Sequence, residues 1–271
     1  MVIYSKLLLI FTFIAIPFLF LHSQTKTDFT SMPGVLEIKE NKYTISVNSI
    51  KNLVDVIYYK FDSKGYLKEL NLDTKEKVNI IKFNYNYDGK LISEKGYNKS
   101  VLSYRIDFEY DDYGNLSEEI FYDSKNNQVS TNKIKYNSKG LVSEKISDVS
   151  VRFSLKNFYN TNNKLYKTEI LSTSSIKKEI EYYYNNLGLL SSETIYTLWK
   201  NNPSAKKYRI SKVEYEYNSD NTLKEKKYFI TDKVTEAFKY YYNDKGYLEK
   251  WEKYNSQGKL VYVVDYEYIY S

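Results

Sequence analysis

The residues of this sequence that could carry out chemistry are carboxylates, tyrosines, lysines and serines, because it has one histidine and no cysteine. The histidine, His22, lies in an N-terminal apolar segment that we expect to be removed. Without it, Ser-His-Asp catalysis, Cys-His catalysis and His or Cys metal sites have no residues to build on. Paired carboxylates could still hydrolyse glycosides, and the Asp111-Asp112 pair could hold calcium.

The pattern of the carboxylates favours a structural role instead. Aspartate recurs at one position of a repeat where other copies have asparagine, which cannot act as an acid or a base. Glutamates between the repeats alternate with lysines, which is typical of solvated strand faces. We therefore predict a protein that is not an enzyme and that needs no metal or cofactor.

The repeat is seven residues long: an aromatic residue, Asp or Asn, two variable residues, Gly or Asn, one variable residue, and Leu or Val. We identify eight copies of it. The copies begin at Phe61, Tyr110, Tyr136, Tyr159, Tyr184, Tyr217, Tyr242 and Tyr254. Residues 87–91 resemble a shortened copy, and residues 122–129 resemble a copy lengthened by one residue.

This repeat predicts a hairpin turn. Asp or Asn at the second position can accept a hydrogen bond from the backbone two residues on. Gly and Asn at the fifth position are the residues that best tolerate a positive φ, as a type I turn closed by a left-handed residue requires. Asp88-Gly89 fits a two-residue type I′ turn. The predicted turn residues are Gly65, Gly89, Gly114, Gly140, Asn163, Gly188, Asn221, Gly246 and Gly258.

Between the turns, apolar or aromatic residues alternate with charged or polar ones, as in 213–217 and 261–270. This period of two predicts strands of about eight residues. Residues 50–271 then form one antiparallel meander of about 15–18 strands, which should curl or roll because each strand pair adds twist. The predicted fold class is all-β, a curled or rolled single sheet in which the 32 tyrosines are mainly structural.

The N-terminal residues 1–23 are typical of a secretory signal peptide. Lys6 supplies its positive charge, Leu7–Leu21 is too short an apolar run to span a membrane, and cleavage is expected after Ser23. We expect no transmembrane segment after it, and the absence of cysteine excludes a lipoprotein anchor. The predicted location is the periplasm, the outer membrane or the outside of the cell.

The remaining chain divides into a flexible linker at 24–34 and a β-repeat domain at 35–271, whose residues 35–49 are predicted to form a capping hairpin that reverses at Glu40-Asn41. The formal net charge of the whole sequence is +6. Lysines and glutamates are interleaved, as in 249–253, which does not favour a phosphate-binding stripe. We therefore expect no nucleic-acid partner.

One loop breaks the spacing of the repeats. Gly188 and Asn221 are 33 positions apart, whereas most other copies are about 25 apart. The excess is aromatic and basic, as contact loops often are. The candidate binding residues are Trp199, Lys200, Lys206, Lys207, Tyr208 and Arg209, for a carbohydrate or an envelope protein. A passive insertion whose tryptophan caps the sheet is the alternative.

Two copies of the repeat, Tyr110–Leu116 and Tyr242–Leu248, resemble the YD repeats of RHS-like proteins, as do the glutamates that follow several copies (Glu119, Glu144 and Glu225). The resemblance covers about 60–260. It implies a secreted or cell-surface protein with spiralling β-sheet shells or strips and a link to carbohydrate or protein binding. Members that encapsulate a toxin are far longer, so we expect no toxin delivery by this chain alone. The composition also resembles that of small exported Bacteroidetes proteins.

We therefore expect a non-enzymatic, exported binding or structural module at the cell envelope. One alternative is an outer-membrane β-barrel, which needs strands of about 9–11 residues with an apolar face toward lipid. Another is a neutralising partner of a secreted toxin. An enzyme with paired carboxylates is the third.

Overall fold

The computed structural model describes residues 31–46, 48–74, 78–148, 153–172, 176–199 and 207–271. The predicted signal peptide and most of the predicted linker therefore lie outside the described residues. Strands make up most of the described chain, and all of them belong to one antiparallel sheet of eighteen strands. The predicted all-β meander is confirmed.

The strands follow one another at short intervals along the sequence. They are β1 (Val35–Ile45), β2 (Lys51–Phe61), β3 (Leu67–Thr74), β4 (Val78–Tyr85), β5 (Leu91–Asn98), β6 (Val101–Tyr110), β7 (Leu116–Asp123), β8 (Gln128–Tyr136), β9 (Val142–Ser147), β10 (Phe153–Tyr159), β11 (Leu165–Ser172), β12 (Ile176–Tyr184), β13 (Leu190–Trp199), β14 (Tyr208–Tyr217), β15 (Leu223–Ile230), β16 (Lys233–Tyr242), β17 (Leu248–Asn255) and β18 (Leu260–Tyr270).

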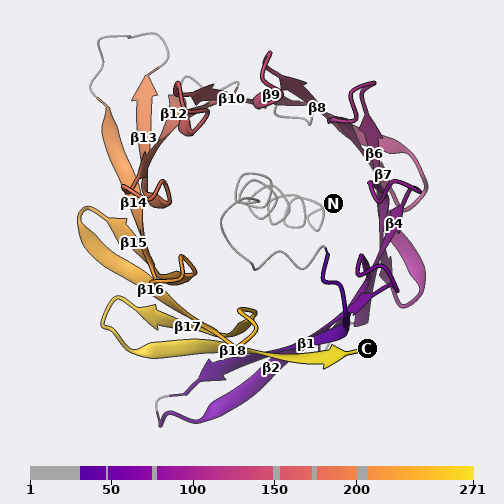
Figure 1. Ribbon diagram of the computed structural model, residues 1–271, viewed down its shortest axis with the longest axis horizontal. Coiled ribbons are helices and arrows are strands. Elements are labelled where there is room, and N and C mark those ends of the chain that lie inside the picture. The colour runs from indigo at the N-terminus through magenta and orange to yellow at the C-terminus, as the bar shows by residue number, and fades with distance from the viewer. Residues whose placement is uncertain (1–30, 47, 75–77, 149–152, 173–175, 200–206) are drawn as a thin grey trace.

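The sheet closes on itself as a barrel. Each strand pairs with its sequence neighbours, and β1 pairs antiparallel with both β2 and β18. In the register, Glu40 of β1 lies opposite Ile57 on one side and Tyr266 on the other. Figure 1 shows the resulting ring of strands. Closure leaves no exposed sheet edge, which removes the usual route to edge-to-edge aggregation.

Repeat turns connect each even-numbered strand to the next odd one from β2 to β17, and they gather at one end of the barrel, the repeat-turn end. In the first, the amide of Gly65 donates to the Asp62 carbonyl at 3.0 Å, and the Asp62 amide donates to the Tyr66 carbonyl at 2.9 Å. The Asp62 carboxylate accepts from the amides of Lys64 and Tyr66. Gly65 has φ +84°, so the turn is a type I turn with a left-handed closing residue.

A positive φ occurs at every residue that the repeat marks as a turn closer, including Asn163 at 60° and Asn221 at 67°. The interpretation of residues 87–91 as a shortened copy was wrong. The turn begins at Tyr85-Asn86, where Asn86 accepts from the Lys90 amide and the Gly89 amide donates to the Asn86 carbonyl, as in a full repeat. The interpretation of residues 122–129 as a lengthened copy was also wrong, because the left-handed residue there is Asn126, at the normal fifth position.

The predicted capping hairpin is wrong as well. Val35–Ile45 is one unbroken strand, and pairing on both of its edges holds Glu40-Asn41 extended. The end of the predicted linker is bonded to the barrel: the Met32 amide donates to the Gly65 carbonyl at 2.8 Å, and the Met32 side chain is only 5% exposed. Residues 31–34 therefore belong to the folded wall.

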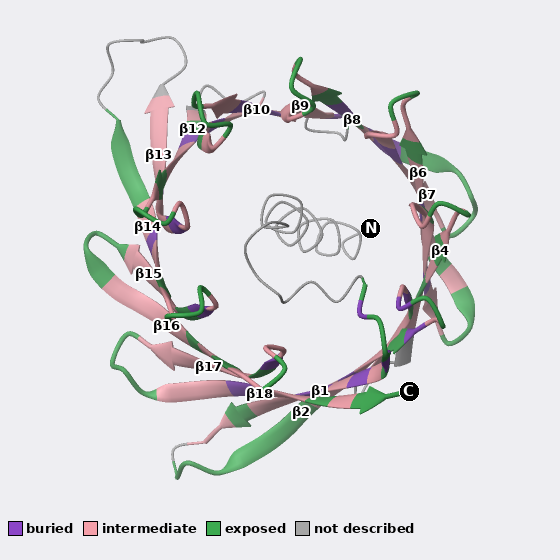
Figure 2. Ribbon diagram, viewed as in Figure 1, coloured by how far each residue is buried: buried purple, intermediate pink, exposed green. Residues whose placement is uncertain are grey.

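The register divides the side chains of the wall into two faces, because residues opposite each other in neighbouring strands point the same way. One face carries most of the buried apolar side chains: Ile38, Ile57, Ile106, Ile134, Leu155, Val213 and Val264. Met32 packs on this face, against Ile38, Phe61 and Leu67. Residues 31–34, which lead into β1, lie on the inner side of the ring, so this is the inner face. Figure 2 shows that buried residues recur on strands around the ring.

Candidate functional site

The outer face is a belt of ion pairs. Lysines and glutamates on neighbouring strands lie close together, as in Lys135–Glu144 at 3.0 Å and Lys177–Glu169 at 2.7 Å. Lys60–Glu69 and Lys133–Glu118 also join neighbouring strands, and Lys212–Glu214 and Lys250–Glu252 are pairs within one strand. Each exposed pair stabilises little on its own, but together they make the middle of the outer wall strongly polar.

The inner face is aromatic and aliphatic, with a few acidic side chains that are held by hydrogen bonds. The Tyr59 hydroxyl donates to Glu40 at 2.5 Å, and the Tyr104 hydroxyl donates to Glu94 at 2.7 Å. Burial raises the pKa of Glu94 despite the Tyr104 hydrogen bond. Burial and the Glu94 charge also raise the pKa of Tyr104. This pair is therefore a neutral hydrogen-bonding unit more readily than a base at neutral pH.

A second inner group centres on Glu119. Lys145 Nζ donates to both carboxylate oxygens at 2.9 and 3.0 Å, and Asn132 donates to Oε2 at 2.7 Å. The side chains of Lys145 and Glu119 are only 12% and 9% exposed. With its partners in place, Glu119 is a structural carboxylate whose oxygens are already occupied.

The largest inner feature is an aromatic patch over β14–β18. It consists of Tyr215, Tyr228, Phe238, Tyr240, Trp251, Tyr262 and Tyr266, which the register places on the inner face. The Trp251 ring centroid lies 5.7 Å from that of Phe238 and 5.5 Å from that of Tyr262, and Trp251 Nε1 donates to the Tyr266 hydroxyl at 3.3 Å. Phe238 and Trp251 are only partly buried, so these rings present apolar surface to the interior.

The predicted loop site is only partly described. Lys200 and Lys206 lie outside the described residues, and nothing is described of the Trp199 side chain. Lys207 is ion-paired with Glu179 and with Glu181, the latter at 2.7 Å, and Arg209 is ion-paired with Asp232. Tyr208 is 59% exposed. Because the described cations already have acidic partners on the wall, little of their charge is left for a ligand.

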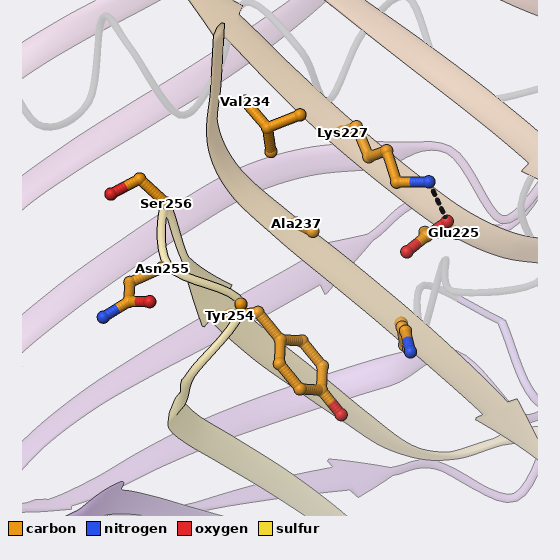
Figure 3. A pocket seen from close by; sticks show the side chains of 9 residues that line it. Glu225, Lys227, Val234, Ala237, Tyr254, Asn255 and Ser256 are labelled. Atoms are coloured by element: carbon orange, nitrogen blue, oxygen red, sulfur yellow. Dashed lines mark ion pairs between the residues drawn. The ribbon is translucent and has the colours of Figure 1, made fainter.

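A hollow of about 350 Å³ lies on the outer face between β15 and β17. Figure 3 shows Tyr254 and Ala237 on its floor and the Lys227–Glu225 ion pair on its rim. The Lys227 Nζ and Glu225 Oε2 atoms are 2.6 Å apart, and the hydrogen bond that Lys227 donates to Glu225 raises the pKa of Lys227. The rim therefore offers a neutralised pair, which makes this hollow a weaker binding candidate than the inner patch.

Sequence reasoning missed the inner acids. Glu94, Glu119 and Glu193 each come three residues after the leucine that ends a repeat, whereas Glu144 and Glu225 come two residues after the last residue of theirs, Val142 and Leu223. The bulge beside each turn puts the third residue on the inner face and the second on the outer face. The spacing to the repeat leucine is thus the signal that distinguishes the two kinds of glutamate.

The described ranges contain neither a cluster of metal ligands nor a membrane-spanning helix. No group of three or more potential ligands there could hold a metal ion. No helix in that part of the chain is long and apolar enough to cross a membrane.

No protein-family model matches the chain, and no curated protein shows significant similarity to it. Among solved structures, it resembles a porin-like protein from Bacteroides uniformis at 11% identity and a TM-score of 0.45, covering 88% of this chain and 99% of that one. A porin-like protein from Bacteroides vulgatus gives 14% identity and a TM-score of 0.43, covering 70% and 94%.

A chain of the Photorhabdus luminescens Tc holotoxin pore gives 12% identity and a TM-score of 0.31, covering 81% of this chain and 17% of that one. With identities and TM-scores this low, these likenesses do not assign a function.

Proposed function

We propose that this protein is a non-enzymatic β-barrel of the cell envelope that holds a ligand against its inner wall. The observation that carries the proposal is the difference between the two faces: the aromatic patch lies inside, and most of the ion pairs lie outside. Exposed apolar surface that is enclosed by a polar rim is typical of ligand sites. Barrels of about 16–18 strands are too wide for their own side chains to fill, so an eighteen-stranded wall supports a ligand in the interior.

The proposal makes the binding or structural module that the sequence predicts a closed container. The inner acids that are described in detail, Glu40, Glu94 and Glu119, are tied to tyrosine or lysine. These contacts favour binding over hydrolysis, because a general acid or base needs a free oxygen near the substrate. Glycans and proteins remain the ligand classes that the repeat resemblance implies.

An outer-membrane β-barrel is the second candidate, and barrel closure favours it over an open module. Seven strands are 10 or 11 residues long, which is enough to span a bilayer. The polarity of the wall opposes it, since each lysine facing lipid at the midplane would cost about 2–4 kcal/mol. Lys135, Lys177 and Lys212 all lie on the outer face, together with the other belt residues.

One experiment separates the two candidates. The full-length chain is expressed with export, and membranes are washed with high salt and carbonate before detergent is added. We expect the protein in the soluble or washed fractions, and we expect an apolar dye such as N-phenyl-1-naphthylamine to gain fluorescence when it binds. Recovery only in detergent would support the outer-membrane barrel. A soluble protein that binds neither the dye nor any member of a glycan array would refute the proposed container.

A further inference from the structure

The aromatic patch has a cation at its edge. Lys226 on β15 lies opposite Tyr215 and Phe238 in the register, so it shares the inner face. Its Nζ is 4.8 Å from the ring centroid of Tyr228 and 5.5 Å from that of Tyr215. Cation–π contacts orient the ammonium group without neutralising its charge.

Three other inner lysines are each paired with an acid. Lys42 pairs with Glu40 at 3.2 Å, Lys145 pairs with Glu119 at 2.9 Å, and Lys253 pairs with Glu236 at 2.5 Å. Within the described part of the wall, no carboxylate lies within ion-pair distance of Lys226. Glu193 acts on it only at longer range, since its own carboxylate accepts a hydrogen bond from Tyr215. Lys226 thus carries its charge at the border of an apolar surface without a contact ion pair.

From this juxtaposition we infer that the patch binds an anionic amphiphile, an acyl chain that ends in one carboxylate. The carboxylate pairs with Lys226, and the chain lies across Tyr228, Phe238 and Trp251. The aromatic rings alone would be enough to bind an uncharged apolar chain. A cation at their edge favours a ligand with a negatively charged end. The inference rests on the proposed function and names its ligand class.

The outer face offers a matched contrast. Lys239 lies on β16, next to β15, and its Nζ is 5.0 Å from the Tyr254 ring. It lies opposite Glu225 and Glu252 in the register, on the charged belt. Lys178 is a second control: it shares the inner face with Ile170 but lies on β12, away from the patch. Neither lysine lies beside the aromatic patch.

The test uses tryptophan fluorescence in the full chain. Because the sequence has two tryptophans, Trp199→Phe leaves Trp251 as the only reporter. Titration with dodecanoate below its micelle concentration should shift or quench Trp251 emission with saturation. Lys226→Met in this background should weaken binding by about tenfold or more. Lys239→Met and Lys178→Met should leave binding unchanged, with circular dichroism confirming that every variant folds.

A second arm uses dodecanol, which has the same chain without the charge. We expect it to bind more weakly than dodecanoate to the parent and equally well to parent and Lys226→Met. Equal binding of dodecanoate by Lys226→Met and the parent would overturn the inference, as would equal binding of the two ligands by the parent. If the apolar dye binds but dodecanoate does not, the ligand class is wrong and the container stands. If neither binds, the ligand class is wrong, and the container fails as well when no member of the glycan array binds.

Discussion

The hydroxyl of Tyr110 donates a 2.8 Å hydrogen bond to the main-chain oxygen of Leu91. Tyr110 begins one repeat and Leu91 ends the previous one, so the bond joins two turns that are separated by a strand pair. The same bond recurs from Tyr136 to Leu116 and from Tyr184 to Leu165. Further members of this tyrosine ladder are Tyr85–Leu67, Tyr159–Val142, Tyr217–Leu190 and Tyr268–Leu248. The ladder explains why tyrosine recurs at the first position of the repeat.

Removing one hydrogen bond of the tyrosine ladder should lower the stability of the barrel modestly. Tyr136→Phe keeps the ring but leaves the Leu116 carbonyl without its donor, so we expect a loss of about 0.5–1.5 kcal/mol in the free energy of unfolding. Phe61 occupies the same repeat position, so phenylalanine fits the site. Urea denaturation followed by circular dichroism measures the loss. Tyr113→Phe is the control, because Tyr113 is 92% exposed at a turn. An equal effect of both changes would contradict the ladder.

The turn closers should tolerate asparagine better than alanine. Gly140 has φ +72°, and a Cβ added there would meet no atom within 4 Å. Gly140→Ala therefore isolates the backbone penalty of the left-handed region, about 1–2 kcal/mol. Gly140→Asn should cost less, because Asn163 and Asn221 occupy the same position with positive φ. Thermal unfolding compares the two with Ser138→Ala in the same turn. Equal stability of all three variants would show that the turn is not strained.

The repeat made the turns and the meander predictable, because a residue with positive φ leaves a local chemical signature in glycine and asparagine. Barrel closure leaves no such signature. It depends on β1 meeting β18, for example Lys42 opposite Val264, and strands so distant in sequence are joined only by the summed twist and curl of the whole sheet. The capping hairpin failed for this reason, since Asn41 suggested a turn where pairing on both edges holds the strand extended.

The functional prediction was based on one irregular loop, and it missed an aromatic surface that is spread over several regular strands. The loop with Trp199 and its basic neighbours was predicted to bind a ligand because it interrupts the repeat spacing. Its described cations Lys207 and Arg209 are ion-paired. The aromatic patch is built from regular repeats, so no single segment marks it. Trp251 lies on the regular strand β17, and its place on the inner face depends on register across several strands.

Stability should respond to pH in opposite directions at the two faces. Burial raises the pKa of Glu94, so its contribution to stability is fully present below the unfolded-state value, near 4.5, and is lost as the pH rises through the folded-state value. Glu94→Gln stays neutral at every pH. We therefore expect this variant to be more stable than the parent at pH 8, with the difference shrinking as the pH falls toward 4.

Glu216 on the outer face provides the opposite case. Its hydrogen bond and ion pair with Lys224, at 2.6 Å, lower its pKa. Its contribution is present above the unfolded-state pKa and is lost as the pH falls through the folded-state value. Glu216→Gln should thus be slightly less stable than the parent at pH 8 and equal to it at low pH. Denaturant midpoints measured from pH 4 to pH 8 test both variants, and the same sign for both would contradict the assignment of faces.

The inner Lys145–Glu119 pair gives the sharpest test of the inner wall. Lys145→Met leaves the buried Glu119 carboxylate with Asn132 as its remaining described donor, so we expect a loss of about 3–5 kcal/mol. Adding Glu119→Gln removes the stranded charge and should restore most of the loss. The double-mutant cycle, measured by urea unfolding, should therefore show strong coupling. The outer pair Lys135–Glu144 is the control, and its coupling should stay below about 1 kcal/mol. Similar coupling energies for both pairs would mean that the inner ion pair is as well solvated as the outer one.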